Sequence, residues 1–199
     1  MPRRFPDDVP VLADGTVRLR AHRPQDAAAI VEQCTDPETL RFTTVPRPYG
    51  PRQAREFLEL VGKEWEASLS TSARSWAIDL GSFPGPGPFA GSIDYRPTGA
   101  GTAEVGYGLH PRARGRGLSA RALNLVLGYA FGEDGIEVMH WRAVVGNWPS
   151  RKAAWRCGFR VEGTVRRFCP LPGGAQDAWI GSLHRDDPRR PCEPWPAGG

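Results

Sequence analysis

The 199-residue chain has few lysines, few cysteines and no long hydrophobic run. No apolar stretch approaches the roughly 18 residues that a membrane-spanning helix needs, so the sequence predicts no membrane partner. The charged, proline-broken start at residues 1–8 has no apolar signal segment, and we therefore expect a cytoplasmic protein. The four cysteines show no C-x-x-C spacing, so no metal site is expected, and without an export signal we expect reduced thiols.

Nearly all of the positive charge is arginine, because Lys63 and Lys152 are the only lysines. With 26 basic and 22 acidic residues, the formal net charge is +4. This weak excess is dispersed among acidic residues, so nucleic acid is not an expected partner. A nucleic-acid-binding domain is the weakest alternative, and it would predict steeply salt-dependent binding.

The two ends of the chain differ in composition from its middle. Residues 1–12 are rich in proline and charge, and the chain from residue 187 onwards is again rich in proline. Neither pattern favours a helix or a ladder of paired strands. We predict a flexible N-terminal segment (1–12), a single domain (13–186) and a flexible proline-rich tail (187–199).

Hydrophobic periodicity predicts a mixed α/β fold. The clearest helix spans 118–131, where apolar residues cover much of the circumference. A strand, this helix and a further strand follow one another, which implies a parallel pair in the middle of the sheet. The predicted strands are 16–21, 75–80, 89–95, 103–109, 137–145, 161–164 and 177–183; the predicted helices are 24–35, 51–69, 118–131 and 148–157, with a turn-rich connection at 81–88.

The segment 104–120 carries the strongest chemical signal. A strand runs into a loop with three arginines and two glycines, and the loop opens the long helix. The free N–H groups and the positive dipole end of such a helix favour an anion, and Gly115 and Gly117 let the backbone approach it closely. Arginine side chains at the rim pair well with phosphates. The simpler alternative is a glycine-rich turn with solvated arginines.

Two common phosphate-binding motifs fit this loop poorly. A P-loop requires a lysine after its last glycine, and this loop has none. The spacing Gly115-x-Gly117-x-x-Ala120 matches the dinucleotide pattern G-x-G-x-x-A, but residues 110–114 separate it from the preceding strand. The next strand also ends at 144–147 without the carboxylate that binds a ribose.

The ordered series of motifs resembles one superfamily. Arg112-Ala-Arg-Gly-Arg-Gly117 matches Q/R-x-x-G-x-G/A, the motif of the GNAT N-acetyltransferase superfamily. The similarity covers residues 14–186 and is strongest to the RimJ/RimL-like branch, which the segments 16–20, 43–46, 103–118, 146–150, 158–159 and 162–163 resemble. The resemblance implies a GNAT-type mixed, largely antiparallel sheet with a splayed central parallel strand pair, flanked by helices.

The resemblance implies acetyl-CoA, or another acyl-CoA, as co-substrate. Its pyrophosphate is expected on main-chain N–H groups of 112–118, its pantetheine between the splayed strands, and its thioester carbonyl on a backbone N–H near 107–109. A deprotonated primary amine then attacks directly, with no covalent enzyme intermediate. The cofactor-binding residues expected on this basis are Tyr107, Leu109, Arg112, Arg114, Gly115, Arg116, Gly117, Leu118, Ser119 and Asn147.

Two residues are candidates for moving protons. Glu104, on the strand before the loop, is the expected base; alternatively, it is a surface carboxylate paired with an arginine. Many relatives protonate the leaving thiolate with a tyrosine, where this chain has Ala154. In the RimJ/RimL-like branch a serine matching Ser150 is given that role, and helix capping is its alternative. Asn147 is likewise either a pantetheine contact or a turn residue.

The acceptor is expected to be a primary amine. Phe42, Tyr49 and Tyr95 are the candidate substrate contacts, around the loop 42–49. A protein N-terminus, a lysine or a small-molecule amine would serve, and the lower pKa of an α-amine slightly favours an N-terminus. Because Ala154 replaces the usual tyrosine, a non-catalytic acyl-CoA-binding or sensor module is the alternative. The resemblance also allows a homodimer, which the sequence itself does not indicate.

Overall fold

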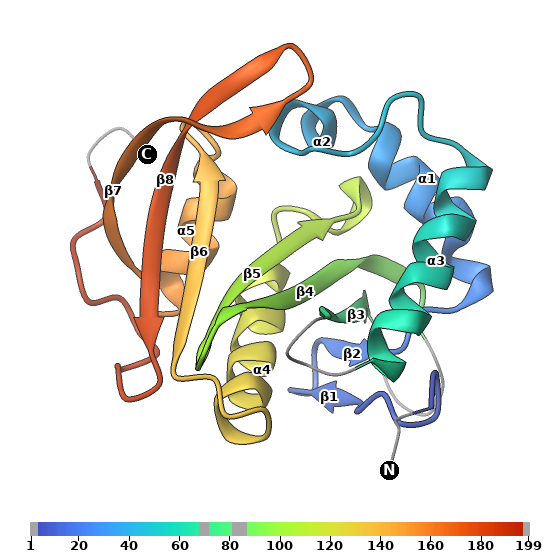
Figure 1. The fold of residues 1–199 in the computed structure, drawn as a ribbon, viewed down its shortest axis with the longest axis horizontal. Helices are drawn as coiled ribbons and strands as arrows, with labels where there is room; N and C mark the ends of the chain where they lie inside the picture. The colour runs from blue at the N-terminus through green and yellow to red at the C-terminus, as the bar shows by residue number, and fades with distance from the viewer. Residues whose placement is uncertain (1–3, 68–71, 81–86, 197–199) are drawn as a thin grey trace.

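The computed structural model describes residues 4–67, 72–80 and 87–196. Its described residues form one eight-stranded sheet in the order β1-β2-β3-β4-β5-β6-β8-β7, with helices packed on both faces (Figure 1). The strands are β1 (Leu12–Ala13), β2 (Arg18–Arg20), β3 (Arg74–Asp79), β4 (Phe89–Gly99), β5 (Thr102–Leu109), β6 (Val138–Val144), β7 (Arg160–Leu171) and β8 (Gly174–His184). The helices are α1 (Ala27–Thr35), α2 (Pro37–Phe42), α3 (Pro51–Glu66), α4 (Leu118–Gly132) and α5 (Trp148–Arg156). Most of the predicted connection 81–88 lies outside the described residues.

All neighbouring strands pair antiparallel except β5 and β6, which are parallel. The parallel pairing starts at Thr102↔Val138 and stops at Val105↔Trp141, although both strands continue beyond it. The two strands therefore separate towards their carboxyl ends. This confirms the predicted mixed sheet with a splayed central parallel pair.

Helix α4 lies at the centre of the core, as its wide apolar face predicts. Leu118, Leu123 and Leu127 are fully buried, and each such side chain contributes roughly 1.5–3 kcal/mol through burial. The Tyr129 ring on the same helix meets the Trp76 ring of β3 edge-on, with ring centroids 5.4 Å apart. Helices α1 and α3 pack together and against the sheet, and α5 packs against α4 and β6. The sheet is therefore covered by helices on both sides.

Three features of the fold differ from the sequence prediction. A short strand, β1, begins at Leu12 in the predicted N-terminal segment and pairs with β2. Asp36-Pro37 ends α1 as expected, but it also begins α2, because the Asp36 carboxylate accepts from the Thr39 N–H at 2.9 Å. An Asp-Pro pair serves as the N-cap and first residue of a helix as well as a stop signal. The β7–β8 hairpin is also much longer than predicted, since a bulge between Val165 and Cys169 interrupts the alternation of residues.

Both ends of the chain contact the domain. The Trp76 indole N–H donates to the Pro10 carbonyl at 2.9 Å. In the tail, the Glu193 carbonyl accepts from the Trp155 indole at 2.7 Å, and the Trp195 ring lies 5.3 Å from that of Trp155. Their predicted flexibility concerns motion and stays a prediction, while the structure shows that residues 4–12 and 187–196 pack against the domain.

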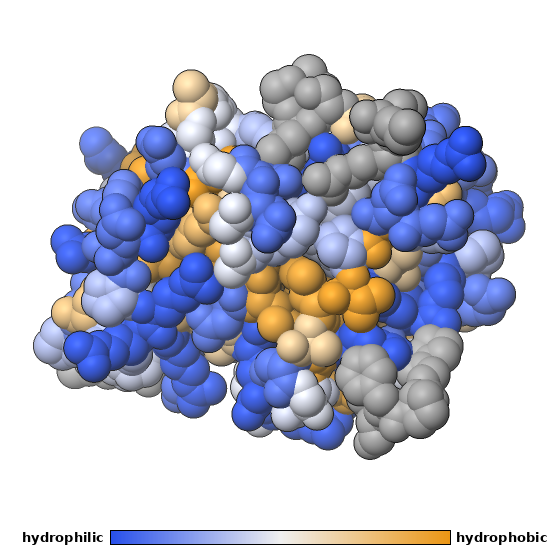
Figure 2. All heavy atoms as spheres, turned by 90° about the horizontal axis from the view of Figure 1, so that it is seen from below, coloured by the Kyte–Doolittle hydropathy of each residue, from blue (hydrophilic) through white to orange (hydrophobic). Residues whose placement is uncertain are grey.

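The described residues on the face seen in Figure 2 are mainly hydrophilic. On the face seen in Figure 2, apolar residues gather near the middle and are bounded by hydrophilic ones. None of the helices in the described part of the chain is both long and apolar enough to cross a lipid bilayer.

Candidate active site

Two cavities open on the domain and share part of their lining. The first, here called the wide cavity, has a volume of about 1270 Å³ and lies between β4–β5 and the α1–α3 side. The second, the loop cavity, has about 520 Å³ and lies at the first turns of α4 and α5. The cavities meet where β5 and β6 separate, and both are lined by Thr39, Phe42, Thr43, Tyr107, Gly108, Asn147 and Ser150.

The loop cavity is built on the N-terminus of α4. Gly117 stands at the N-cap with φ 72°, and Gly115 has φ 74°, a left-handed backbone that favours glycine. Leu118, Ser119 and Ala120 line the cavity from the first turn of the helix. N–H groups in a first turn have no partner within the helix, so this turn is suited to hold an anion. The glycines, Leu118 and Ser119 thus lie where the sequence predicts them.

The three loop arginines do not all face this cavity. Arg114 lines it, but its guanidinium is held by Asp36 at 2.6 Å and Glu38 at 3.0 Å. Arg112 pairs with Glu32 at 3.0 Å, and neither it nor Arg116 lines either cavity. The prediction that Arg112 and Arg116 bind the cofactor is therefore not supported. The acidic side chains of α1 and α2 draw two of these guanidiniums towards themselves.

Two cations that the sequence analysis missed complete the loop cavity. Lys152 and Arg156 project from α5 and line it together with Arg114, against one carboxylate, Glu38. A Cβ added to Gly117 would lie 3.6 Å from an Arg156 guanidinium nitrogen, which shows how closely α5 approaches the loop. The i, i+4 spacing put both cations on one helix face. Only the packing of α5 against α4 brings that face to the loop.

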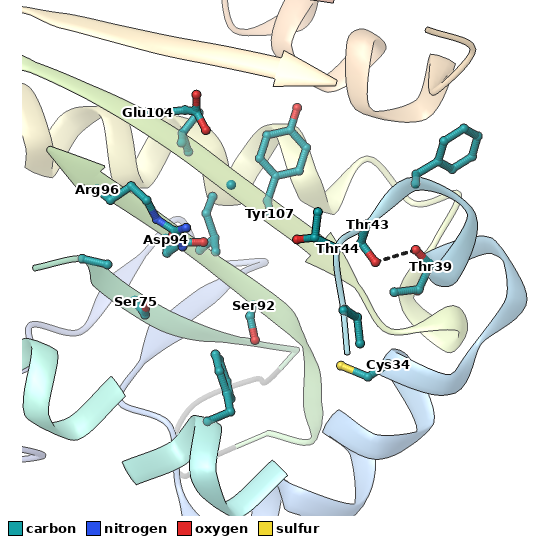
Figure 3. A pocket seen from close by; sticks show the side chains of 18 of the residues that line it. Cys34, Thr39, Thr43, Thr44, Ser75, Ser92, Asp94, Arg96, Glu104 and Tyr107 are labelled. Atoms are coloured by element: carbon teal, nitrogen blue, oxygen red, sulfur yellow. Dashed lines mark hydrogen bonds and ion pairs between the residues drawn. The ribbon is translucent and has the colours of Figure 1, made fainter. Parts of the chain in front are cut away.

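The wide cavity has a polar floor and an apolar wall (Figure 3). Ser92, Asp94 and Arg96 face it from β4, and Glu104 faces it from β5. The wall comes from α3, the loop 42–49 and the tip of the β7–β8 hairpin, and includes Phe42, Val45, Tyr49, Phe57, Leu60 and Leu171. Leu109 lines the loop cavity instead.

Two of the predicted substrate contacts lie at a cavity and one does not. Phe42 lines both cavities, and Tyr49 lines the wide one, where burial raises the pKa of its phenol. Tyr95 is fully buried and bonds Asp134 through its hydroxyl. Because side chains alternate along a strand, its neighbours Asp94 and Arg96 reach the cavity while Tyr95 faces the core. Tyr95 is therefore corrected from a substrate contact to a core residue.

Carboxylates outnumber guanidiniums in the wide cavity. Its charged lining residues, among those that the structure describes, are Glu56, Glu64, Asp94, Arg96, Glu104 and Arg142. Glu104 is 3.1 Å from Arg142. The sequence analysis left such an arginine pair open as the alternative to a role for Glu104 as the base. Asp94 is 2.6 Å from Arg96. Desolvation by burial raises the pKa of both Asp94 and Glu64.

Hydroxyl groups gather where the two cavities meet. The Tyr107 hydroxyl donates to the Ser150 carbonyl at 2.8 Å and lies 3.3 Å from Ser150 Oγ. Ser150 Oγ also accepts from the Trp141 indole N–H at 3.0 Å. Asn147 caps α5, because its Oδ1 accepts from the Ser150 N–H at 3.2 Å. Burial raises the pKa of the Tyr107 phenol. Both predicted residues, Asn147 and Ser150, are thus at the junction and also hold the start of α5.

The donor set suits an acyl-CoA. The cationic loop cavity, with its free helix N–H groups, suits phosphates, and the separated ends of β5 and β6 lead from it to the wide cavity. Within the described residues, no three His, Cys, Asp or Glu side chains are grouped as metal ligands.

Comparison with known proteins identifies a family. The model of the acetyltransferase (GNAT) domain family matches residues 16–160. An uncharacterized N-acetyltransferase, p20, from Bacillus licheniformis is 24% identical over 168 residues, which cover 83% of this chain and 90% of that protein.

Solved structures share the fold. Mycobacterium smegmatis RimJ, in complex with CoA-disulfide, has a TM-score of 0.75 at 21% identity and covers 92% of this chain and 90% of its own. The microcin C7 self-immunity acetyltransferase MccE, in complex with acetyl-CoA and AMP, has a TM-score of 0.74 at 20% identity, with 86% and 93% covered. Because the family model spans most of the domain and the fold agrees, the chain belongs to the GNAT acetyltransferase family.

Proposed function

We propose that this acetyltransferase moves an acetyl, or another short acyl, group from acyl-CoA to a primary amine while both substrates are bound. The observation that carries the proposal is the pair of cavities of opposite charge that meet at Tyr107, Asn147 and Ser150. A reaction between two bound substrates needs two such sites joined at one point. Direct attack then needs no enzyme nucleophile.

The loop cavity is the proposed donor site. Phosphate oxygens accept from the first-turn N–H groups of α4, beside Arg114, Lys152 and Arg156. The thioester then reaches the junction between β5 and β6, where a backbone N–H of residues 107–109 polarises its carbonyl. Tyr107, Gly108 and Leu109 line the loop cavity along this path.

The wide cavity is the proposed acceptor site. Its excess of carboxylates favours a cationic ammonium group, and its volume of about 1270 Å³ leaves room for more than a simple alkylamine. A peptide N-terminus or a small-molecule amine with a bulky body suits this space, and the apolar wall with Phe42 and Tyr49 supplies contacts for that body.

Amine acylation also needs two proton transfers. A carboxylate takes a proton from the ammonium group, and both Asp94 and Glu104 line the wide cavity. The leaving thiolate needs a proton at the junction, where Ser150 is our proposed donor. The Trp141 indole N–H donates to Ser150 Oγ and stabilises negative charge on that oxygen.

Thiol release in steady-state assays tests this function. Acetyl-CoA is offered with a panel of peptides that differ in the first residue, with lysine-bearing peptides and with small amines. The same peptides with acetylated N-termini serve as controls. Lines that intersect in double-reciprocal plots are expected for a complex of both substrates. Parallel lines would contradict direct attack, and acetyl-CoA binding without turnover on any amine would favour the sensor module.

A further inference from the structure

Two carboxylates of the wide cavity stand at different places relative to the point where β5 and β6 separate. In the β4–β5 register, Asp94 lies opposite Gly106 and Glu104 lies opposite Arg96. The last parallel pair is Val105↔Trp141, so Gly106 is the first β5 residue past it. Glu104 lies within the paired part. Two residues along a strand span about 7 Å, which places Asp94 one such step closer to the junction.

The Asp94 carboxylate lies directly against the Gly106 backbone. A Cβ at Gly106 would stand 3.0 Å from Asp94 Oδ1, which is tighter than side chains tolerate easily. The glycine therefore makes room for the carboxylate. The next two residues along β5, Tyr107 and Gly108, line both cavities. Asp94 thus faces the space through which an amine must approach the thioester (Figure 3).

The arginine partners of the two carboxylates differ in exposure and in their other contacts. Arg142 pairs with Glu104 and also lies over the Phe168 ring, 5.4 Å from its centroid. Arg96 pairs with Asp94 from the same strand, and its side chain is 64% exposed. Moving an exposed, flexible arginine into solvent costs little. An incoming ammonium group can therefore take the place of Arg96 beside Asp94.

The charged surroundings of Asp94 also favour proton uptake. Burial raises its pKa, Arg96 opposes that shift and Glu104 adds to it. Glu64 faces it from α3, and Arg142 stands on the far side of Glu104. A carboxylate whose pKa lies nearer the working pH is a better general base.

We propose that Asp94, rather than Glu104, binds the acceptor's ammonium group and acts as the catalytic base, so that the enzyme selects acceptors presenting a primary ammonium. This inference rests on the proposed function. In the step, an ammonium proton moves to an Asp94 carboxylate oxygen and the nitrogen lone pair forms a bond to the thioester carbonyl carbon. The C–S bond breaks, and its electron pair leaves with the sulfur, which takes up the Ser150 hydroxyl proton as the thiol. The second proton that the nitrogen loses as the amide forms replaces it on Ser150.

Asp94→Asn and Glu104→Gln, compared side by side, test the assignment. Calorimetry with acetyl-CoA first establishes that each variant folds and binds the donor. Asp94→Asn is then expected to lower kcat/KM for the amine by about 10²- to 10⁴-fold and to abolish the acidic limb of the pH profile. Glu104→Gln should lose far less and keep that limb. Glu59→Gln, an exposed position on α3 that lines neither cavity, is the matched control. The reverse ranking would overturn the proposal.

Arg96→Ala supplies a second test that leaves the carboxylate in place. Without the cation at 2.6 Å, the pKa of Asp94 rises, so the acidic limb should move to higher pH. The ¹³C carboxyl signal of Asp94 in NMR should titrate at a correspondingly higher pH, and in the wild type it should respond to added amine. Absence of both NMR effects would overturn the proposal. If the wild type releases no thiol with any amine, the proposed function fails, while this amine response still tests ammonium binding at Asp94.

Discussion

The loop cavity and the wide cavity meet at one junction but are assembled in different ways. The main-chain part of the loop cavity is a single run of chain, residues 114–120, whose backbone geometry is set by Gly115 and Gly117. The wide cavity takes its charged residues from α3, β4, β5 and β6. Main-chain N–H groups at a helix start therefore need only a local motif, whereas an acidic pocket needs side chains from distant segments.

The largest expected effect on stability concerns His22, which lies beneath the wide cavity and contacts its lining residues Ser92 and Phe57. Its Nε2 is 3.0 Å from Ser92 Oγ, and burial lowers its pKa from 6.5 to about 4. Since the unfolded chain binds this proton first as pH falls, the stabilisation is complete above pH 6.5 and is lost towards pH 4. The expected loss is about 3 kcal/mol. Urea unfolding at pH 7 and pH 4 measures it.

His22→Gln isolates this contribution, because it retains a hydrogen-bond partner for Ser92 but does not titrate in this range. Its stability should depend less on pH than that of the wild type by the same amount. Identical pH dependence in the two proteins would show that His22 is not the group responsible.

Reversing the charge of the loop cavity should remove the difference in charge between the two cavities. The double variant Lys152→Glu/Arg156→Glu is expected to weaken acetyl-CoA binding about 100-fold, because charge-assisted contacts to phosphate are lost. The KM of the amine should change little. Calorimetry measures the Kd. Arg116→Glu, on the same loop but outside both cavities, should change it less than about 3-fold. An equal loss in that control would indicate that the loop arginines bind the phosphates, as the sequence analysis predicted.

A smaller effect should follow from Gly117→Ala. A non-glycine residue at φ 72° costs about 1–2 kcal/mol, so we expect roughly 10-fold weaker acetyl-CoA binding. The new Cβ would lie 3.6 Å from Arg156, an ordinary contact, so backbone strain is the cause. Gly163→Ala, which meets nothing within 4 Å and has no positive φ, should bind acetyl-CoA as the wild type does. Unchanged binding in Gly117→Ala would mean that the loop tolerates other geometries.

The smallest expected effect tests whether the carboxylates of the wide cavity attract the amine. Glu64→Gln removes one partly exposed carboxylate and should lower kcat/KM for the amine by about 3-fold, with the acetyl-CoA Kd unchanged. The difference should shrink in high salt, which screens the interaction. Initial rates at two salt concentrations measure it, and a loss that is independent of salt would point to altered packing instead.

Much of the fold could be predicted from local patterns. The helix 118–131 and the strands on either side of it follow from hydrophobic periodicity, and their order required a parallel pair. The bulged β7–β8 hairpin could not be predicted at its full length, because its exposed residues and the bulge hide the alternation on which strand prediction depends. The prediction for Tyr95 was wrong for a related reason. Neighbouring side chains along a strand face opposite sides of the sheet, so a shift of one residue moves a side chain from the cavity to the core.

The sequence by itself predicted the order of the elements apart from β1 and α2, the glycine-rich turn before α4 and the placement of Ser150 and Asn147 at the start of α5. These depend on residues that are neighbours in the chain. Only the tertiary structure decided that Arg112 and Arg114 pair with acidic residues of α1 and α2, that α5 supplies Lys152 and Arg156, and that Asp94 lines the wide cavity opposite Gly106. Charge pairing and cavity lining depend on which distant segments pack together, and no local pattern records that choice.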